Sequence, residues 1–228
     1  MTGEPGPSGQ ASPEAVLEEA DIISSSGGAM RLTAEFEAAM GVYHDSYIDL
    51  EEREYQRSVA EEFAIDPQEV AEVIDRLGVT REQFIAYLAI SAQLGREISM
   101  TERAEMAMLV TQCAPSTPVP DEMVMLDDET YETYLRGHSQ TVVFVWRRFC
   151  EPCDRMKREL ESESSVFPPD VAVAGLDGEA TPTFRRAFNV DVAPSVLLFR
   201  GSTCERTLTG YHSSDAIADA CAAVYADG

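Results

Sequence analysis

Two cysteines separated by two residues, Cys150 and Cys153, are the side chains of this chain best suited to chemistry. The residues before them, 141–146, form a continuous apolar run typical of a strand buried on both faces. The charged residues after them, 154–160, are typical of a helix. This succession places the first sulfur at a helix N-terminus, where unpaired backbone N–H groups and the helix dipole stabilise a thiolate. The second cysteine falls in the first helical turn, close enough to form a disulfide with the first.

Basic residues gather around this pair in a chain that is otherwise acidic. Five of its 17 lysines and arginines lie within twelve positions: Arg147, Arg148, Arg155, Lys157 and Arg158. We expect Arg147, Arg148 and Arg155 to form a collar that favours the Cys150 thiolate and attracts acidic partners. The alternative is that these side chains are helix-surface charges paired with Glu159 and Glu161. Glu151, next to Cys150, should raise the pKa of the Cys150 thiol modestly.

The remaining cysteines and the histidines lack the paired spacing of a metal site, so we predict no metal. Cys113, Cys204 and Cys221 are expected to be buried apolar fillers. An alternative for Cys113 is a redox role beside a linker. The sequence has no phosphate-binding glycine loop and no Ser-His-Asp signature, and it indicates no organic cofactor.

The composition limits the class of protein. A net charge of -24 argues against binding nucleic acid. Lys157 is the only lysine, and this acid-rich, lysine-poor composition resembles that of proteins from extreme halophiles. One close cysteine pair among five cysteines suits a reducing compartment. The first residues lack the pattern of a signal peptide, and no apolar run approaches the ~20 residues of a membrane span. We therefore expect a cytoplasmic protein that does not bind a membrane.

The first half of the chain divides by composition into three segments. Residues 1–30, rich in Gly, Pro, Ser and Glu, predict a disordered tail with a short helix over 13–22. Residues 31–113 have helical periodicity, with helix start signals at Asp66 and Thr80, and predict an all-α domain. The prolines of residues 114–121 predict an extended linker.

One part of the helical domain, residues 70–94, also fits a helix-turn-helix DNA reader. The acidic composition favours instead a packed bundle, which could serve dimerisation or hold a partner.

Residues 122–228 alternate between strand and helix periodicity, which predicts an α/β domain. The expected strands cover 123–126, 141–146, 171–176, 195–200 and 204–208, and helices fill the intervals and the C-terminus. The order is βαβαβαββα, a parallel half followed by an antiparallel hairpin. This order predicts a central mixed sheet flanked by helices.

From Met123 to Tyr225, these elements and motifs resemble the thioredoxin family. A strand, Trp146, a CxPC sequence and a helix occur in the family's order, and Leu176-Asp177 ends the next strand. Val192-Ala193-Pro194-Ser195 matches the family's cis-proline site, and Gly210 matches the glycine that faces the active site. The resemblance covers a little under half of the chain.

The resemblance implies a thioredoxin-like fold and thiol–disulfide exchange. Cys150 would attack a substrate disulfide, and Cys153 would resolve the mixed disulfide. Pro194 would be cis, and the substrate strand would pair with Ala193 beside Cys150. The implied substrate-binding residues are Trp146, Phe149, Glu151, Pro152, Ala193, Pro194 and Gly210. The implied partners are disulfide-containing proteins and a recharging partner of the thioredoxin-reductase type, with no cofactor beyond the disulfide itself.

The active-site sequence departs from the family's pattern. The usual Trp-Cys-Gly-Pro-Cys is replaced by Phe149-Cys150-Glu151-Pro152-Cys153. The family's buried aspartate, six residues before the first cysteine, is replaced by Phe144, and no nearby acid obviously substitutes for it. Resolution by Cys153 is therefore expected to be slower, or to rely on water or Glu151 for the proton transfer.

Three hypotheses follow. The leading one is a thiol–disulfide oxidoreductase with an N-terminal helical domain. The first alternative is a thioredoxin-fold adaptor with little redox turnover, whose function lies in the helical domain. The second alternative is a DNA-binding redox regulator.

Overall fold

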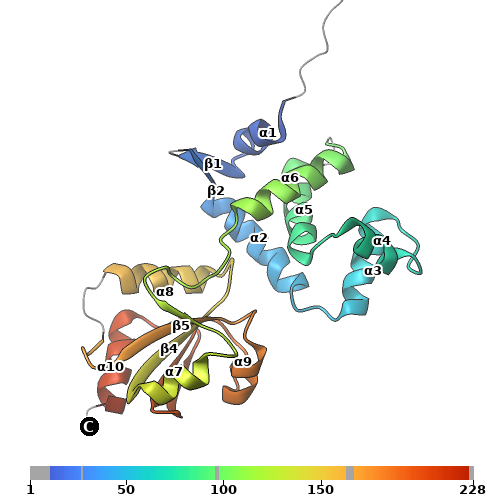
Figure 1. Ribbon diagram of the computed structural model, residues 1–228. Coiled ribbons are helices and arrows are strands. Elements are labelled where there is room, and N and C mark those ends of the chain that lie inside the picture. The colour runs from blue at the N-terminus through green and yellow to red at the C-terminus, as the bar shows by residue number, and fades with distance from the viewer. Residues whose placement is uncertain (1–10, 27, 96–97, 163–166, 226–228) are drawn as a thin grey trace, which may run out of the picture. The chain divides into compact units, whose positions relative to one another are not determined.

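The computed structural model describes residues 11–26, 28–95, 98–162 and 167–225. The chain divides into two compact units, Met1–Ala114 and Pro115–Gly228. Figure 1 labels most of their helices and strands. Among the described residues, no helix is both long and apolar enough to cross a membrane.

The N-terminal unit is mostly helical, with one small hairpin. Its elements are α1 (Pro13–Glu19), β1 (Ile23–Ser26), β2 (Ala29–Leu32), α2 (Ala34–Tyr47), α3 (Glu52–Phe63), α4 (Val70–Leu77), α5 (Arg81–Leu94) and α6 (Met100–Cys113). Phe84 on α5 packs against Tyr55, Val59 and Val70 of α3 and α4. The expected helical domain is therefore present, with a two-stranded antiparallel hairpin in front of it.

The prediction of a disordered tail over residues 1–30 is wrong for the residues that the structure describes. Helix α1 and the β1–β2 hairpin occupy much of this stretch, and Leu17, Ile22 and Ile23 are buried. The Gln93 side chain donates a hydrogen bond to the Ala20 carbonyl oxygen at 2.7 Å, which ties the stretch to α5. The prediction failed because it weighed the Ser and Gly content of the stretch and not these three apolar side chains, which fold onto the helices. Residues 1–10 and 27 lie outside the described part of the chain.

Helix α5 begins where the sequence predicts, and α4 does not. Thr80 and Gln83 form a reciprocal capping box at the start of α5. The start signal at Asp66 leads first to a turn, in which the Asp66 carboxylate accepts the Gln68 N–H at 2.8 Å. Helix α4 then begins only at Val70.

The C-terminal unit has the predicted βαβαβαββα order. Its elements are β3 (Val124–Leu126), α7 (Tyr131–Gly137), β4 (Gln140–Trp146), α8 (Glu151–Ser162), β5 (Ala172–Asp177), α9 (Pro182–Phe188), β6 (Ser195–Arg200), β7 (Thr203–Thr209) and α10 (Ser214–Tyr225). The strands form one sheet in the order β3-β5-β4-β6-β7. Strands β3, β5 and β4 are parallel, and β6 and β7 are added antiparallel. The unit has a thioredoxin-like α/β fold with a mixed sheet flanked by helices.

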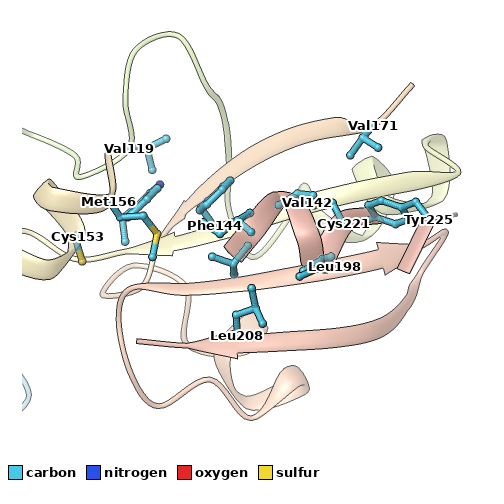
Figure 2. Close-up of a cluster of buried hydrophobic side chains, with 14 residues drawn as sticks. Val119, Val142, Phe144, Cys153, Met156, Val171, Leu198, Leu208, Cys221 and Tyr225 are labelled. Carbon is cyan, nitrogen blue, oxygen red and sulfur yellow. The ribbon is translucent and has the colours of Figure 1, made fainter. Parts of the chain in front are cut away.

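The central strand β4 is apolar throughout because both of its faces are covered. Val142, Phe144 and Trp146 point to the face under α8 and α10, whereas Val143 and Val145 point to the face under α7 and α9. Figure 2 shows the first of these clusters, with Cys153 and Tyr225 at its opposite ends. The sulfur of Cys153 is therefore part of the hydrophobic core.

The proline-rich segment 114–121 is not a simple extended linker. Val119 is buried and belongs to the same core cluster as Phe144 and Trp146. Strand β5 makes room for it with Gly175, where an added Cβ would lie only 2.7 Å from Val119 Cγ1. The prolines in the sequence indicate only that no helix continues through this segment. They carry no information on whether Val119 packs on the sheet.

Candidate functional site

Cys150 is the residue immediately before α8. Its sulfur accepts the backbone N–H of Cys153 at 3.3 Å, and its carbonyl oxygen accepts the N–H of Asp154 at 3.0 Å. These contacts are those of a helix N-cap residue, with sulfur in the place of the usual oxygen. Pro152 has no N–H of its own, so it does not compete for the sulfur. The predicted position of Cys150 at a helix N-terminus is confirmed.

The two cysteines form a disulfide, and they differ in exposure. Cys150 is half-buried, whereas Cys153 is fully buried. Their Cα atoms are 5.2 Å apart within the first turn of α8. Only Cys150 is therefore open to a disulfide that approaches from solvent.

A second segment, distant in sequence, lies beside Cys150. The Ala193–Pro194 peptide bond is cis, as the resemblance implied, and the Ala193 carbonyl oxygen lies 3.8 Å from Cys150 Sγ. Gly210 donates its N–H to the Pro194 carbonyl oxygen at 2.8 Å. Gly210 adopts φ +83, a conformation that favours glycine. Three predicted site segments, at Cys150, Pro194 and Gly210, thus meet at one end of the strands, where β4 and β7 finish and β6 begins.

The aromatic and flanking residues predicted for the site fall into two groups. Glu151 and Pro152 are exposed and Phe149 is half-buried, at positions where a substrate can reach them. Phe149 has φ +51, unusual for a residue with a bulky side chain. Trp146, in contrast, is fully buried. The burial of Trp146 does not support its assignment to the substrate-binding residues, because its indole belongs to the core cluster beneath α8.

The three arginines of the expected collar are paired with acids. Arg147 and Arg148 both bind Glu179, at 3.4 Å and 3.1 Å, and the Glu179 side chain is only 9% exposed. Arg155 pairs with Glu159 at 3.4 Å and lies over the ring of Tyr211. A collar of uncompensated cations is thus not what the structure contains. Sequence reasoning missed Glu179 because it lies more than 30 positions from its arginines, just after β5.

The end of β5 carries a further acid beside this cluster. The Asp177 carboxylate accepts the N–H of Glu179 at 2.9 Å. Burial raises the pKa of Asp177, although its hydrogen bonds and the charge of Arg148 oppose that rise. The region beside Cys150 is therefore a compact network of two acids and two arginines.

Phe144 occupies the position of the family's buried aspartate. It is fully buried and stacks on Trp146, with ring centroids 5.1 Å apart and ring planes within 1° of parallel. The core cluster that contains Cys153 therefore has an aromatic ring at this position and not a carboxylate. The replacement of the family's buried aspartate by Phe144 thus puts a stacked aromatic pair in the core.

The other cysteines do not join the site. Burial raises the pKa of Cys221 to about 11 and also raises the pKa of Cys113. Cys204 is half-buried on β7. Within the described ranges, no group of three or more His, Cys, Asp or Glu side chains could hold a metal ion.

Comparisons with known proteins point to one family. The Thioredoxin family model matches residues 122–223. Thioredoxin of Alicyclobacillus acidocaldarius is 27% identical over 90 residues, which are 40% of this chain and 86% of that protein. Protein disulfide-isomerase A5 of Mus musculus is 28% identical over 93 residues, which are 38% of this chain but only 18% of that protein.

One solved structure is similar to this chain over about the same fraction of its length as these relatives are. Chlamydomonas reinhardtii thioredoxin f2 aligns with a TM-score of 0.41 and 23% identity, over 45% of this chain and 96% of that chain. The family match begins at residue 122, just after Val119 joins the core, and ends within α10. By the match to the family model, residues 122–223 form a domain of the thioredoxin family.

Proposed function

We propose that this protein is a thiol–disulfide oxidoreductase that works through the dithiol of Cys150 and Cys153. Thiol–disulfide oxidoreduction is supported at the level of the family by the family match and by the thioredoxin and disulfide-isomerase relatives. The observation that carries the specific proposal is the position of Cys150. Its half-exposed sulfur caps a helix N-terminus beside the Ala193 carbonyl, while its partner is buried.

The proposed thiol–disulfide exchange has two steps. In the reduced protein, the Cys150 thiolate attacks one sulfur of a substrate disulfide, and the other substrate sulfur leaves as a thiolate. The Cys153 thiol then loses its proton and attacks Cys150, which releases the second substrate thiolate and forms the Cys150–Cys153 disulfide. Two electrons pass to the substrate. A dithiol-supplying reductase, as a recharging partner, returns them to the protein.

The geometry gives each surrounding residue a part in this reaction. Backbone N–H groups at the start of α8 stabilise the Cys150 thiolate. An extended substrate segment fits beside the backbone of Ala193, within reach of Cys150. Phe149, Glu151 and Pro152 border the sulfur on the exposed side.

Serine variants test the assignment directly. Cys150→Ser should abolish reduction of insulin disulfides by dithiothreitol above the uncatalysed rate. Cys153→Ser should form mixed disulfides with insulin that persist until a second thiol is added. Cys204→Ser, at a half-buried cysteine outside the site, should reduce insulin like the parent protein. Unchanged insulin reduction by Cys150→Ser would show that the nucleophile is assigned wrongly.

A binding role with little turnover is the second candidate, and Phe144 favours it. No carboxylate replaces Phe144 in the core cluster that holds Cys153, so proton removal from Cys153 has no evident base there. A pair that stays reduced at the redox poise of a glutathione buffer would favour this candidate over exchange.

The helix-turn-helix alternative is not supported by the arrangement of α4 and α5. Six of the 14 residues of α5 are buried, including Phe84, Ile85 and Ile90. Arg81, which would face DNA, donates instead to the carbonyl oxygens at the end of α2 and pairs with Glu52. A recognition helix needs an exposed face with free basic and amide groups.

A further inference from the structure

The C-terminal unit contains a pocket that the exchange reaction does not use. It has a volume of about 540 Å³ and is lined by residues of β3, β4, α8 and β5 and of the segments beside them. All of its lining residues fall between Pro120 and Val173, within one unit. Small-molecule sites commonly have volumes of ~300–1,000 Å³ and mostly apolar walls. The walls here are apolar, formed by Pro120, Met123, Val124, Leu160, Phe167 and Val173.

Two hydrogen-bond donors line the more buried part of this pocket. Trp146 is fully buried, and its Nε1–H has no hydrogen-bond partner among the described residues. Lys157 has a side chain 18% exposed, and its Nζ lies 5.5 Å from the centroid of the Trp146 ring. Because a buried N–H without an acceptor is unfavourable, an oxygen that reached the indole would be bound well.

Two side chains lie near the indole N–H over Gly175: Val119, which is buried, and Met123, which is flexible. A Cβ placed on Gly175 would lie 2.9 Å from Met123 Sδ and 3.4 Å from Trp146 Nε1, so these two atoms are neighbours over the same glycine. Methionine has three rotatable bonds and adapts readily to a new neighbour. A ligand oxygen can therefore reach the N–H if the Met123 side chain rotates.

The exposed part of the pocket has the opposite charge character. Glu122 and Glu161 both line it and are both exposed. Neither carboxylate has an ion-pair partner among the residues that the structure describes, whereas Lys157 is paired with Asp154 at 3.1 Å. The rim therefore favours a cation, and the interior favours an acceptor oxygen.

We propose that this pocket is a second binding site, which takes a small amphipathic molecule with a carbonyl oxygen at its apolar end and an ammonium group at its other end. The carbonyl accepts from Trp146 Nε1–H, the apolar body packs on Phe167, Val173 and Leu160, and the ammonium group lies at Glu122 and Glu161. The site is separate from the surface beside Cys150, so it does not depend on the proposed exchange reaction.

The test uses three probes and one spectroscopic signal. N-(4-aminobutyl)benzamide has both polar features, N-butylbenzamide lacks the ammonium group, and 6-phenylhexylamine lacks the carbonyl. Trp146 is the only tryptophan, so the full chain gives one indole N–H cross-peak in a ¹H–¹⁵N spectrum. The full probe should shift this peak downfield and bind about fivefold more tightly than either of the other two.

Two variants with matched controls make the result specific. Val173→Phe fills the pocket and should abolish the shift, whereas Val42→Phe, the same change at an exposed position of α2, should not. Glu122→Gln with Glu161→Gln should remove the advantage of the ammonium probe and leave N-butylbenzamide binding unchanged. The absence of any indole shift with the full probe, or an equal shift in Val173→Phe, would overturn the proposal.

Discussion

The two sulfurs of the disulfide lie three residues apart in surroundings of opposite character. Cys150 is half-exposed, accepts a backbone N–H and lies beside the network of Arg147, Arg148 and Glu179. Cys153 is fully buried among apolar side chains that include Phe144 and Met156. The first environment stabilises a thiolate and the second disfavours one, because burial penalises charge. For the proposed exchange, these surroundings favour attack by Cys150 on the substrate disulfide over attack by Cys153 on the mixed disulfide.

The largest expected effect comes from giving Cys153 the acid that its surroundings lack. Phe144→Asp should shorten the lifetime of the mixed disulfide in single-turnover quench experiments, because a carboxylate can take the proton of Cys153. It should also lower the free energy of unfolding by about 3 kcal/mol or more, because it buries a carboxyl group and removes the stack on Trp146.

Phe144→Leu is the control for this change. It removes the aromatic stack but adds no carboxylate, so it should cost about 1–1.5 kcal/mol and leave the mixed-disulfide lifetime unchanged. If the leucine variant resolved as fast as the aspartate variant, packing rather than proton transfer would control the second step.

A smaller effect is expected on the side of Cys150. Glu179→Gln leaves Arg147 and Arg148 without their shared carboxylate and should cost about 1–3 kcal/mol in urea unfolding. The freed positive charge should speed the attack of Cys150 on a small disulfide and leave the second step unchanged. Glu132→Gln, which breaks an exposed pair with Arg136, should cost less than about 0.5 kcal/mol. Slower attack in Glu179→Gln would contradict an electrostatic role for the network.

The free energy of unfolding should depend on pH through the titration of Asp177. Because its pKa is raised in the folded state, the folded protein binds this proton more tightly than the unfolded chain does. Its contribution to stability is therefore fully present below the unfolded pKa of about 3.8 and is lost as pH rises through the folded value. Asp177→Asn, which can keep the acceptor for the Glu179 N–H, should remove this loss and raise Tm slightly at pH 7. A lower Tm across the whole pH range would show that the carboxylate is needed for another contact.

The smallest expected effect concerns the cysteines outside the pair. Since burial raises the pKa of Cys221 to about 11, the native reduced protein should not be alkylated there by iodoacetamide at pH 8. Cys150 should be alkylated first, as followed by peptide mass mapping. Early modification of Cys221 would mean that the core opens on the timescale of labelling.

The sequence predicted the C-terminal unit well because its signals are local. Apolar runs, the CxPC motif and the cis-proline motif each indicate the structure of the residues that form them. The strands, the helices and the position of Cys150 could therefore be predicted from them. Glu179 and Val119 were missed because their partners are distant in sequence, and an acid after a strand or a valine among prolines has no local signature. The burial of Trp146 could have been inferred from the continuous apolar run that ends with it. In the N-terminal stretch, serine and glycine content outweighed Leu17, Ile22 and Ile23, which fold onto helices elsewhere in the unit.

The most direct test of the central claim is the pKa of the Cys150 thiol in the Cys153→Ser variant, followed by thiolate absorbance in molar KCl. The helix N-terminus predicts a pKa clearly below the ordinary value of about 8.5, near the ~7 typical of a working CxxC thiol. A pKa at or above about 8.5 would contradict the claim that this site is prepared for attack.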